Sequence, residues 1–150
     1  MMYLYYLNQL KPNTMKYIPL IGRILFSLIF ISSGIMGHMI NLQQTSAYAA
    51  SSGLPMPTVL VLVSGIIALL GGLSILLGYK AKLGALLIVI FLIPVTFTMH
   101  NFWTITDPAQ QMMKTIQMSL FMKNIALIGA ALMIAYFGSG PVSIDANPKA

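Results

Sequence analysis

Residues 58–78 read TVLVLVSGIIALLGGLSILLG, a stretch that contains no charged side chain. A helix needs about 20 consecutive apolar residues to cross the hydrocarbon core of a bilayer. The stretch is too long for a buried strand, so it predicts a membrane-spanning α-helix. Three further stretches have the same character, and they cover residues 18–40, 83–103 and 120–137.

Short connections between four such helices favour antiparallel packing of neighbours. We therefore expect an all-α integral membrane protein, a four-helix transmembrane bundle over residues 18–138. In this interpretation residues 1–17 are an N-terminal cytoplasmic or interfacial segment, and residues 139–150 are a cytoplasmic tail.

Composition supports the membrane assignment. Of the 150 residues, 58% are hydrophobic and 7% are charged, whereas soluble domains carry about 25% charged residues. These values exclude a water-soluble enzyme, a disordered protein and a free nucleic-acid binder. The net charge of +6 comes from 8 Lys and Arg against 2 Asp and Glu. The absence of cysteine excludes disulfides, thiol redox chemistry and thiolate metal sites.

The lysines predict the orientation in the membrane. Lys11 and Lys16 precede the first span, and Lys80 and Lys82 lie between the second and third spans. The connection over residues 41–57 carries no charge. Cytoplasmic loops are enriched in Lys and Arg, so both termini and the turn 79–82 are expected to face the cytoplasm.

The two longer connections contain local structural signals. Residues 54–57 (LPMP) should be extended, because a proline disfavours α geometry in the residue before it. Asp107 followed by Pro108 is typical of a helix start, with the aspartate as N-cap. Beyond it, the apolar residues of 109–120 share one face. This pattern predicts a short amphipathic interfacial helix before the fourth span.

Small residues recur at four-residue spacing, which allows close helix packing in lipid. They are Ser64, Ala68 and Gly72 in the second span, Ser33 and Gly37 in the first, and Ala126 and Ala130 in the fourth.

Polar residues inside a membrane are costly and are therefore functional candidates. In the first span Arg23, Ser27, Gly34 and His38 share one helix face, which should point into the bundle. Arg23 is expected to extend its guanidinium towards the cytoplasmic side.

The predicted topology brings three segment ends to a similar depth in the outer leaflet. One ends the first span, one ends the third, and one begins the fourth. The candidate site residues on these segments are His38, His100, Asn101, Trp103, Lys123 and Asn124.

A quinone head group needs hydrogen-bond donors beside an apolar slot, and this set could supply them. In that hypothesis His38 and His100 donate to the head group, Lys123 and Asn124 polarise it, and Phe102 and Trp103 form its walls. Haem between the two histidines is a second option. We predict no metal site, because two histidines without carboxylates are a thin ligand set. The structural alternative is a set of interfacial polar residues, with Lys123 snorkelling outward and Trp103 in an aromatic belt.

Other chemistry is excluded by missing residues. Asp107 and Asp145 are the only acids, and both lie in flanking segments. Neither a carboxylate pair nor a Ser–His–acid set can therefore form in the membrane. No Gly-rich phosphate loop is present. Proton-coupled transport is disfavoured for the same lack of acids.

The chain resembles the DoxX family of small four-helix bacterial membrane proteins over roughly residues 22–145. The resemblance rests on the order and spacing of several elements: Gly22-Arg23-Ile24-Leu25 with Gly34, Tyr48-Ala49 with Gly53-Leu54-Pro55, Gly65 with Gly71-Gly72-Leu73 and Leu76-Leu77-Gly78, His100-Asn101-Phe102-Trp103, and Met122-Lys123-Asn124-Ile125-Ala126-Leu127. The chain departs from the family at Ala68, where members often carry Glu, and at His38, where they often carry Lys. In relatives that Glu would be a partner for the fourth-helix Lys, so Lys123 lacks it here.

The resemblance implies a multi-pass protein of the bacterial inner membrane with a role beside quinone-linked redox or oxidative-stress complexes. The leading expectation is a quinone-linked subunit that works with other membrane or redox subunits, or with a second copy of the chain. The alternative is a non-catalytic scaffold or assembly subunit. Passage of a small solute is disfavoured, because the second and fourth spans offer no polar path.

Overall fold

The structure is a computed structural model that describes residues 13–146. Within this range it consists of helices and turns, without a strand, which confirms the predicted all-α fold. The elements in chain order are η1 (Asn13–Tyr17), α2 (Ile18–Ser32), η2 (Ser33–Ile40), α3 (Leu42–Ser51), α4 (Pro57–Leu77), α5 (Ala81–Met99), η3 (Phe102–Thr104), η4 (Pro108–Gln110) and α6 (Gln111–Phe137).

Four helical stretches are long and apolar enough to cross a membrane. They are Met15–Ile40, Pro57–Leu77, Ala81–Thr104 and Pro108–Phe137. The four predicted spans are thereby confirmed, although the fourth helical stretch begins well before residue 120. Most of the N-terminal segment predicted for residues 1–17 lies outside the described residues.

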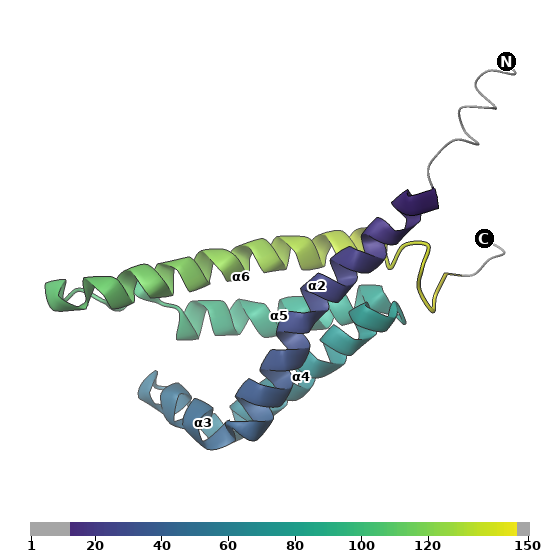
Figure 1. Cartoon of the computed structure of the whole chain (residues 1–150). Coiled ribbons are helices and arrows are strands. Elements are labelled where there is room, and N and C mark those ends of the chain that lie inside the picture. The colour runs from purple at the N-terminus through teal and green to yellow at the C-terminus, as the bar shows by residue number, and fades with distance from the viewer. Residues whose placement is uncertain (1–12, 147–150) are drawn as a thin grey trace, which may run out of the picture.

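The four long helices pack in pairs that define their order in space. The central helices α4 and α5 pack against each other, α2 packs on α4, and α6 packs on α5. Figure 1 shows α5 and α6 side by side, with α2 crossing α4. The start of α2 and the end of α6 lie at one end of the molecule, here named the Arg23 end (Figure 1). The opposite end of α5 and α6 is named the His100 end.

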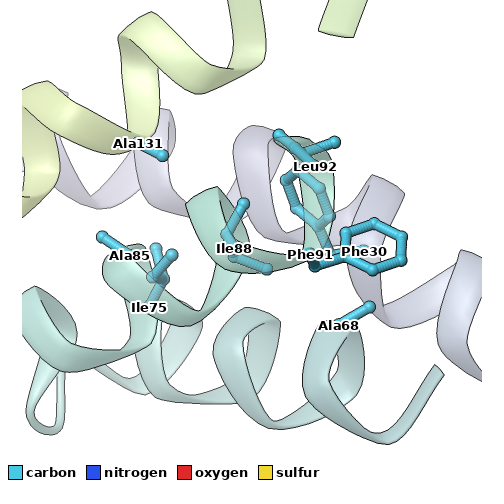
Figure 2. Packing of buried hydrophobic residues seen from close by; sticks show 8 residues of the cluster. All are labelled: Phe30, Ala68, Ile75, Ala85, Ile88, Phe91, Leu92 and Ala131. Atoms are coloured by element: carbon cyan, nitrogen blue, oxygen red, sulfur yellow. The ribbon is translucent and has the colours of Figure 1, made fainter. Parts of the chain in front are cut away.

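The core lies where the central helices meet their neighbours. Figure 2 shows its eight buried residues, which are Phe30, Ala68, Ile75, Ala85, Ile88, Phe91, Leu92 and Ala131. The rings of Phe30 and Phe91 meet edge to face with centroids 6.3 Å apart. One buried residue of this core, Ala131, comes from α6, so that helix closes the core from the α5 side.

Glycines allow the helix backbones to approach closely. A Cβ built on Gly71 would lie 2.9 Å from the carbonyl oxygen of Gly84, and a Cβ on Gly34 would lie 2.9 Å from that of Gly65. Ala68 and Gly72 are buried as the four-residue pattern predicted. The pattern was wrong at Ala126, which is exposed.

The end of the first span is a π-helix, the segment η2. The wider turn is closed by a hydrogen bond from the backbone N–H of Asn41 to the Met36 carbonyl, and the Asn41 side chain donates to the same oxygen. Arg23, Ser27 and Gly34 are buried and His38 is half-buried, so the predicted inward face of the first span is confirmed.

The connection after η2 differs from the expectation. It contains the helix α3, which the sequence analysis did not predict, and which Gly53 ends in a left-handed conformation (φ +79°). The backbone N–H groups of Gly53 and Leu54 donate to the Ala50 and Ala49 carbonyls, which is the Schellman pattern. The prediction of extended backbone was wrong at Met56, which is left-handed (φ 47°). Pro57 disfavours right-handed α geometry there, and this left-handed residue caps α4.

Asp107 is the N-cap at the start of the fourth span, as predicted. The Asp107 carboxylate accepts a hydrogen bond of 2.9 Å from the backbone N–H of Ala109. The amphipathic helix over residues 109–120 is not a separate element, however. It is the first part of α6, which continues without a break to Phe137.

We expect replacement of Asp107 by alanine to lower stability by about 1 kcal/mol, because N-cap substitutions by alanine typically have this effect. In a protein of this size the unfolding midpoint should fall by about 2–4 °C. Asp107→Asn is the matched control, since asparagine caps equally well. Thermal unfolding in mild detergent, followed by the fluorescence of the single tryptophan, measures the difference. Equal midpoints for both variants would contradict the capping role.

The segment after α6 folds back onto the α4–α5 turn. The backbone N–H groups of Ile144 and Asp145 donate to the Leu77 and Gly78 carbonyls, at 3.2 and 3.0 Å. The Asp145 carboxylate in turn accepts a hydrogen bond from the backbone N–H of Lys80. Residues 139–146, predicted as a cytoplasmic tail, therefore form an ordered cover over this end of the bundle.

Arg23 fixes this cover. Its side chain is buried, and its guanidinium donates to the carbonyl oxygens of Ser139 (2.9 Å) and Val142. Arg23 thus extends towards the end of the bundle that carries the 79–82 turn, as expected, but its guanidinium is covered by the C-terminal segment instead of being exposed. Its Nε atom and the hydroxyl of Ser27 are buried without a hydrogen-bond partner among the described residues.

Candidate functional site

Three segments meet in a hydrogen-bonded network at the His100 end. The Nδ1–H of His100 donates to Oε1 of Gln117 at 2.8 Å, because the amide oxygen can only accept. The Gln117 amide nitrogen donates to the Tyr48 hydroxyl at 3.1 Å, and that hydroxyl donates to the Met99 carbonyl at 3.2 Å. The network therefore joins α3, the end of α5 and α6.

Four aromatic rings pack against one another about one helical turn from Gln117 along α6. Phe121 lies four residues after Gln117, on the same face of α6. Its ring meets those of Phe97, Phe102 and Trp103 edge to face, with centroids 5.4, 5.6 and 5.7 Å apart. We name these four residues the aromatic cluster. Trp103 and Phe97 are exposed, so the cluster opens onto the apolar surface that lipid would cover.

The direction of the hydrogen bonds defines what His100 offers to a ligand. When Nδ1 carries the proton of a neutral imidazole, Nε2 is an acceptor. No hydrogen bond within residues 13–146 involves Nε2 of His100. The side chain is half-buried, so Nε2 can accept a hydrogen bond from a hydroxyl group of a ligand.

The other site residues predicted on α6 and after α5 differ in how deeply they are buried. Asn124 is buried, at 4% exposure, whereas Lys123 is exposed and faces away from the core. Consecutive residues of an α-helix point about 100° apart, so Lys123 points away from the core when Asn124 points into it. Asn101 is half-buried, and its backbone carbonyl accepts the Thr104 hydroxyl at 2.9 Å.

His38 does not join this site. Its Nδ1–H donates to the Ser33 carbonyl at 2.8 Å, and its ring lies against Phe91 with centroids 5.9 Å apart. Phe91 lies eight residues before Met99 on α5, which is about 12 Å of helix rise. The structure therefore separates His38 from His100, contrary to the expectation that both face one site.

The separation of His38 from His100 also disfavours a haem bound between them. Two axial histidines must bind the same iron, and these two are held on different neighbours at different depths. Among residues 13–146 no three His, Asp or Glu side chains gather as a metal site would require. The residues present therefore do not fit a haem between His38 and His100.

Two hollows on the described surface have linings that do not include the aromatic cluster. One is lined by Ile40, Asn41, Gln43, Gln44 and Ala47 beside α3, and the other lies at the α4–α5 turn.

Sequence reasoning missed three residues of the site. Tyr48 lies in α3, which was interpreted as a loop, Gln117 in the segment interpreted as an interfacial helix, and Phe121 at the start of the predicted fourth span. A signal was present in the spacing: Gln117 and Phe121 form an i, i+4 pair that continues the helical periodicity of the fourth span.

The chain is similar to known membrane proteins. The DoxX family model matches residues 18–101. The inner membrane protein YphA of Escherichia coli (strain K12) is 31% identical over 126 residues, which are 84% of this chain and 86% of that protein. The inner membrane protein YqjF of the same organism is 30% identical over 129 residues, covering 84% and 88%.

A more distant similarity reaches eukaryotic proteins. The Surfeit locus protein 4 homolog of Drosophila melanogaster is 35% identical over 75 residues, half of this chain and 27% of that protein. No solved structure matches the chain significantly. The family match covers more than half of the residues, and it agrees with the four apolar helices. The chain is thus a multi-pass membrane protein that belongs to the DoxX family.

Proposed function

We propose that the protein is a quinone-linked subunit of a membrane redox complex, and that it binds the reduced head group, a quinol, beside His100. The observation that carries the proposal is the Tyr48–Gln117–His100 network, which fixes the imidazole with Nε2 as an acceptor. A quinol hydroxyl is the matching donor.

The surroundings suit a quinol in two further respects. The aromatic cluster offers ring edges and faces on which a flat head group can pack. Its exposure to the lipid side gives the isoprenoid tail a path into the bilayer without a tunnel through the protein. The proposal differs from the hypothesis drawn from the sequence in two points: His38 is not part of the site, and His100 accepts a hydrogen bond from the head group instead of donating one.

The chain supplies binding and one proton acceptor. Oxidation of a quinol releases two protons and two electrons. Nε2 of His100 can take one proton, and the second must pass to a proton acceptor on the partner subunit that takes the electrons. The electrons must pass to an acceptor on another subunit, because the chain contains no cysteine and its described part gathers no three His, Asp or Glu side chains as metal ligands. The proposal thus requires a partner in the same membrane.

Extraction of purified protein with organic solvent, followed by mass spectrometry of the quinone pool, tests the proposal. We expect near-stoichiometric quinone in the unmodified protein. His100→Ala should lower it by about tenfold, the value of one good hydrogen bond. Gln117→Leu should lower it less, because the ring remains but its orientation is lost.

His38→Ala is the matched control, since it removes an imidazole of similar burial away from the site. Its quinone content should equal that of the unmodified protein. Loss of quinone in His38→Ala but not in His100→Ala would contradict the proposed site. Absence of quinone from the unmodified protein, compared with an unrelated membrane protein prepared identically, would overturn the proposal.

A scaffold or assembly subunit is the second candidate, and the packing of α6 favours it. This helix packs on α5 and leaves most of its surface outside the core, including exposed Met112, Met122, Leu132 and Met133. A partner helix could cover that face. The scaffold hypothesis predicts that His100→Ala leaves complex assembly intact, whereas bulky or charged substitutions on this face of α6 abolish it.

A further inference from the structure

We propose that the Arg23 end carries a binding site for the headgroup of an anionic phospholipid, in the hollow between the α4–α5 turn and the C-terminal segment. The hollow has a volume of about 450 Å³ and is lined by residues 80–83, 137–140, 145 and 146. The proposal does not depend on quinol binding, because the two sites lie at opposite ends of the bundle.

The charges that line the hollow favour an anionic headgroup. Lys80 and Lys82 line the hollow, and both side chains are exposed. The one acid in the lining, Asp145, already accepts a hydrogen bond from the backbone N–H of Lys80. The ammonium of Lys80 lies 5.5 Å from the centroid of the Tyr79 ring. Within residues 13–146 neither ammonium group makes a hydrogen bond to a protein acceptor, so both are available to a phosphate diester.

The apolar side of the hollow suits the acyl chains of a lipid. Leu83 and Phe137 line it and are 58% and 71% exposed. They belong to the ends of two membrane-spanning helices, so they lie where the acyl chains of a lipid begin. Cationic groups above exposed apolar side chains at a helix end match the two parts of a phospholipid. A free phosphate would use only the lysines.

Hydrogen bonds within the protein fix the walls of the hollow without a ligand. Arg23 holds the carbonyls of Ser139 and Val142, while the backbone of residues 144 and 145 is bonded to Leu77 and Gly78. A Cβ on Gly138 would lie 3.3 Å from Cε of Lys82, so the lysine stem packs directly on the C-terminal segment. Little ordering is left to be done on binding, which favours affinity.

The test uses the full chain in nanodiscs that contain equal amounts of dioleoyl-phosphatidylcholine and dioleoyl-phosphatidylglycerol, with native mass spectrometry of the retained lipids. We expect about a tenfold preference for phosphatidylglycerol in the most tightly retained lipid, because each lysine near a membrane surface contributes several-fold. Lys80→Gln with Lys82→Gln should reduce the preference to below about twofold.

Lys11→Gln with Lys16→Gln is the matched control, because it removes the same charge from the sequence before α2. The preference should persist in this variant. An equal loss in both double variants would overturn the proposal, since it would show a general effect of surface charge. A protein that retains inorganic phosphate in detergent but shows no preference for phosphatidylglycerol would also overturn it, as would the absence of any preference in the unmodified protein.

Discussion

Replacing Gly65 by alanine is expected to destabilise the protein by about 3 kcal/mol, at the upper end of the range for overpacking. A Cβ at this position would lie 2.3 Å from Cβ and 2.9 Å from Cγ of His38. Both atoms are close to the η2 backbone, so a rotation of the His38 side chain cannot relieve the clash. The helices α4 and η2 must move apart, which also removes the neighbouring contact of Gly34 with Gly65.

Gly129→Ala is the matched control, because a Cβ at Gly129 would meet nothing within 4 Å. Alanine is a better helix former than glycine, so this variant should be unchanged or slightly more stable. Thermal unfolding in detergent should show a midpoint lower by about 6–12 °C for Gly65→Ala alone. Equal midpoints for the two variants would show that α4 and η2 do not pack as described.

Replacing Arg23 by methionine is expected to release the C-terminal segment from the Arg23 end. The substitution removes two hydrogen bonds from a charged guanidinium, each of which contributes about 1.5–3 kcal/mol. The global stability should change less than this sum, because the freed carbonyls can bind water at the end of the bundle. Hydrogen exchange of the amides of Ile144 and Asp145 should therefore accelerate by about 100-fold.

Two further variants separate charge from geometry at Arg23. Arg23→Lys keeps the charge but has one ammonium in place of two directed N–H groups, so its exchange should be intermediate. Lys16→Gln removes an exposed charge just before α2 and should leave the exchange of residues 144 and 145 unchanged. Unchanged exchange in Arg23→Met would contradict the role of Arg23 in holding the segment.

The transmembrane fold could be predicted from the sequence because its cause is local. An uncharged run such as residues 58–78 must lie in lipid, whatever its neighbours are. The connections were harder, since α3 is stabilised by contacts that no local pattern reveals. Ser46 and Ala49 are buried, and the Thr45 hydroxyl donates to the Gly37 carbonyl at 2.6 Å.

The candidate site was predicted in part. His100, Phe102 and Trp103 were identified because they end a predicted span, and the structure places them beside α6. Their pairing with His38 was wrong, because helix phase and depth were inferred from topology alone. Equal depth in a membrane does not fix which neighbour a side chain faces: His38 lies against Gly65 and Phe91 instead.

The hydrogen-bond partners of Arg23 could not be predicted from the sequence either. The sequence indicated an isolated cation near a membrane surface, for which water is the usual partner. The partner in the structure is the backbone of a segment more than a hundred residues away. Carbonyl groups carry no residue-specific signal, so sequence patterns could not reveal this contact.

Photolabelling with a short-chain azido-quinol, followed by mapping of the labelled peptides, tests the central claim most directly. The label should attach to peptides that contain residues 97–103 and 117–121, and unlabelled quinol should compete for it. His100→Ala should abolish that labelling, while His38→Ala should leave it intact. Labelling centred on His38 and Phe91, or labelling that unlabelled quinol does not displace, would contradict a quinol site at the His100 end.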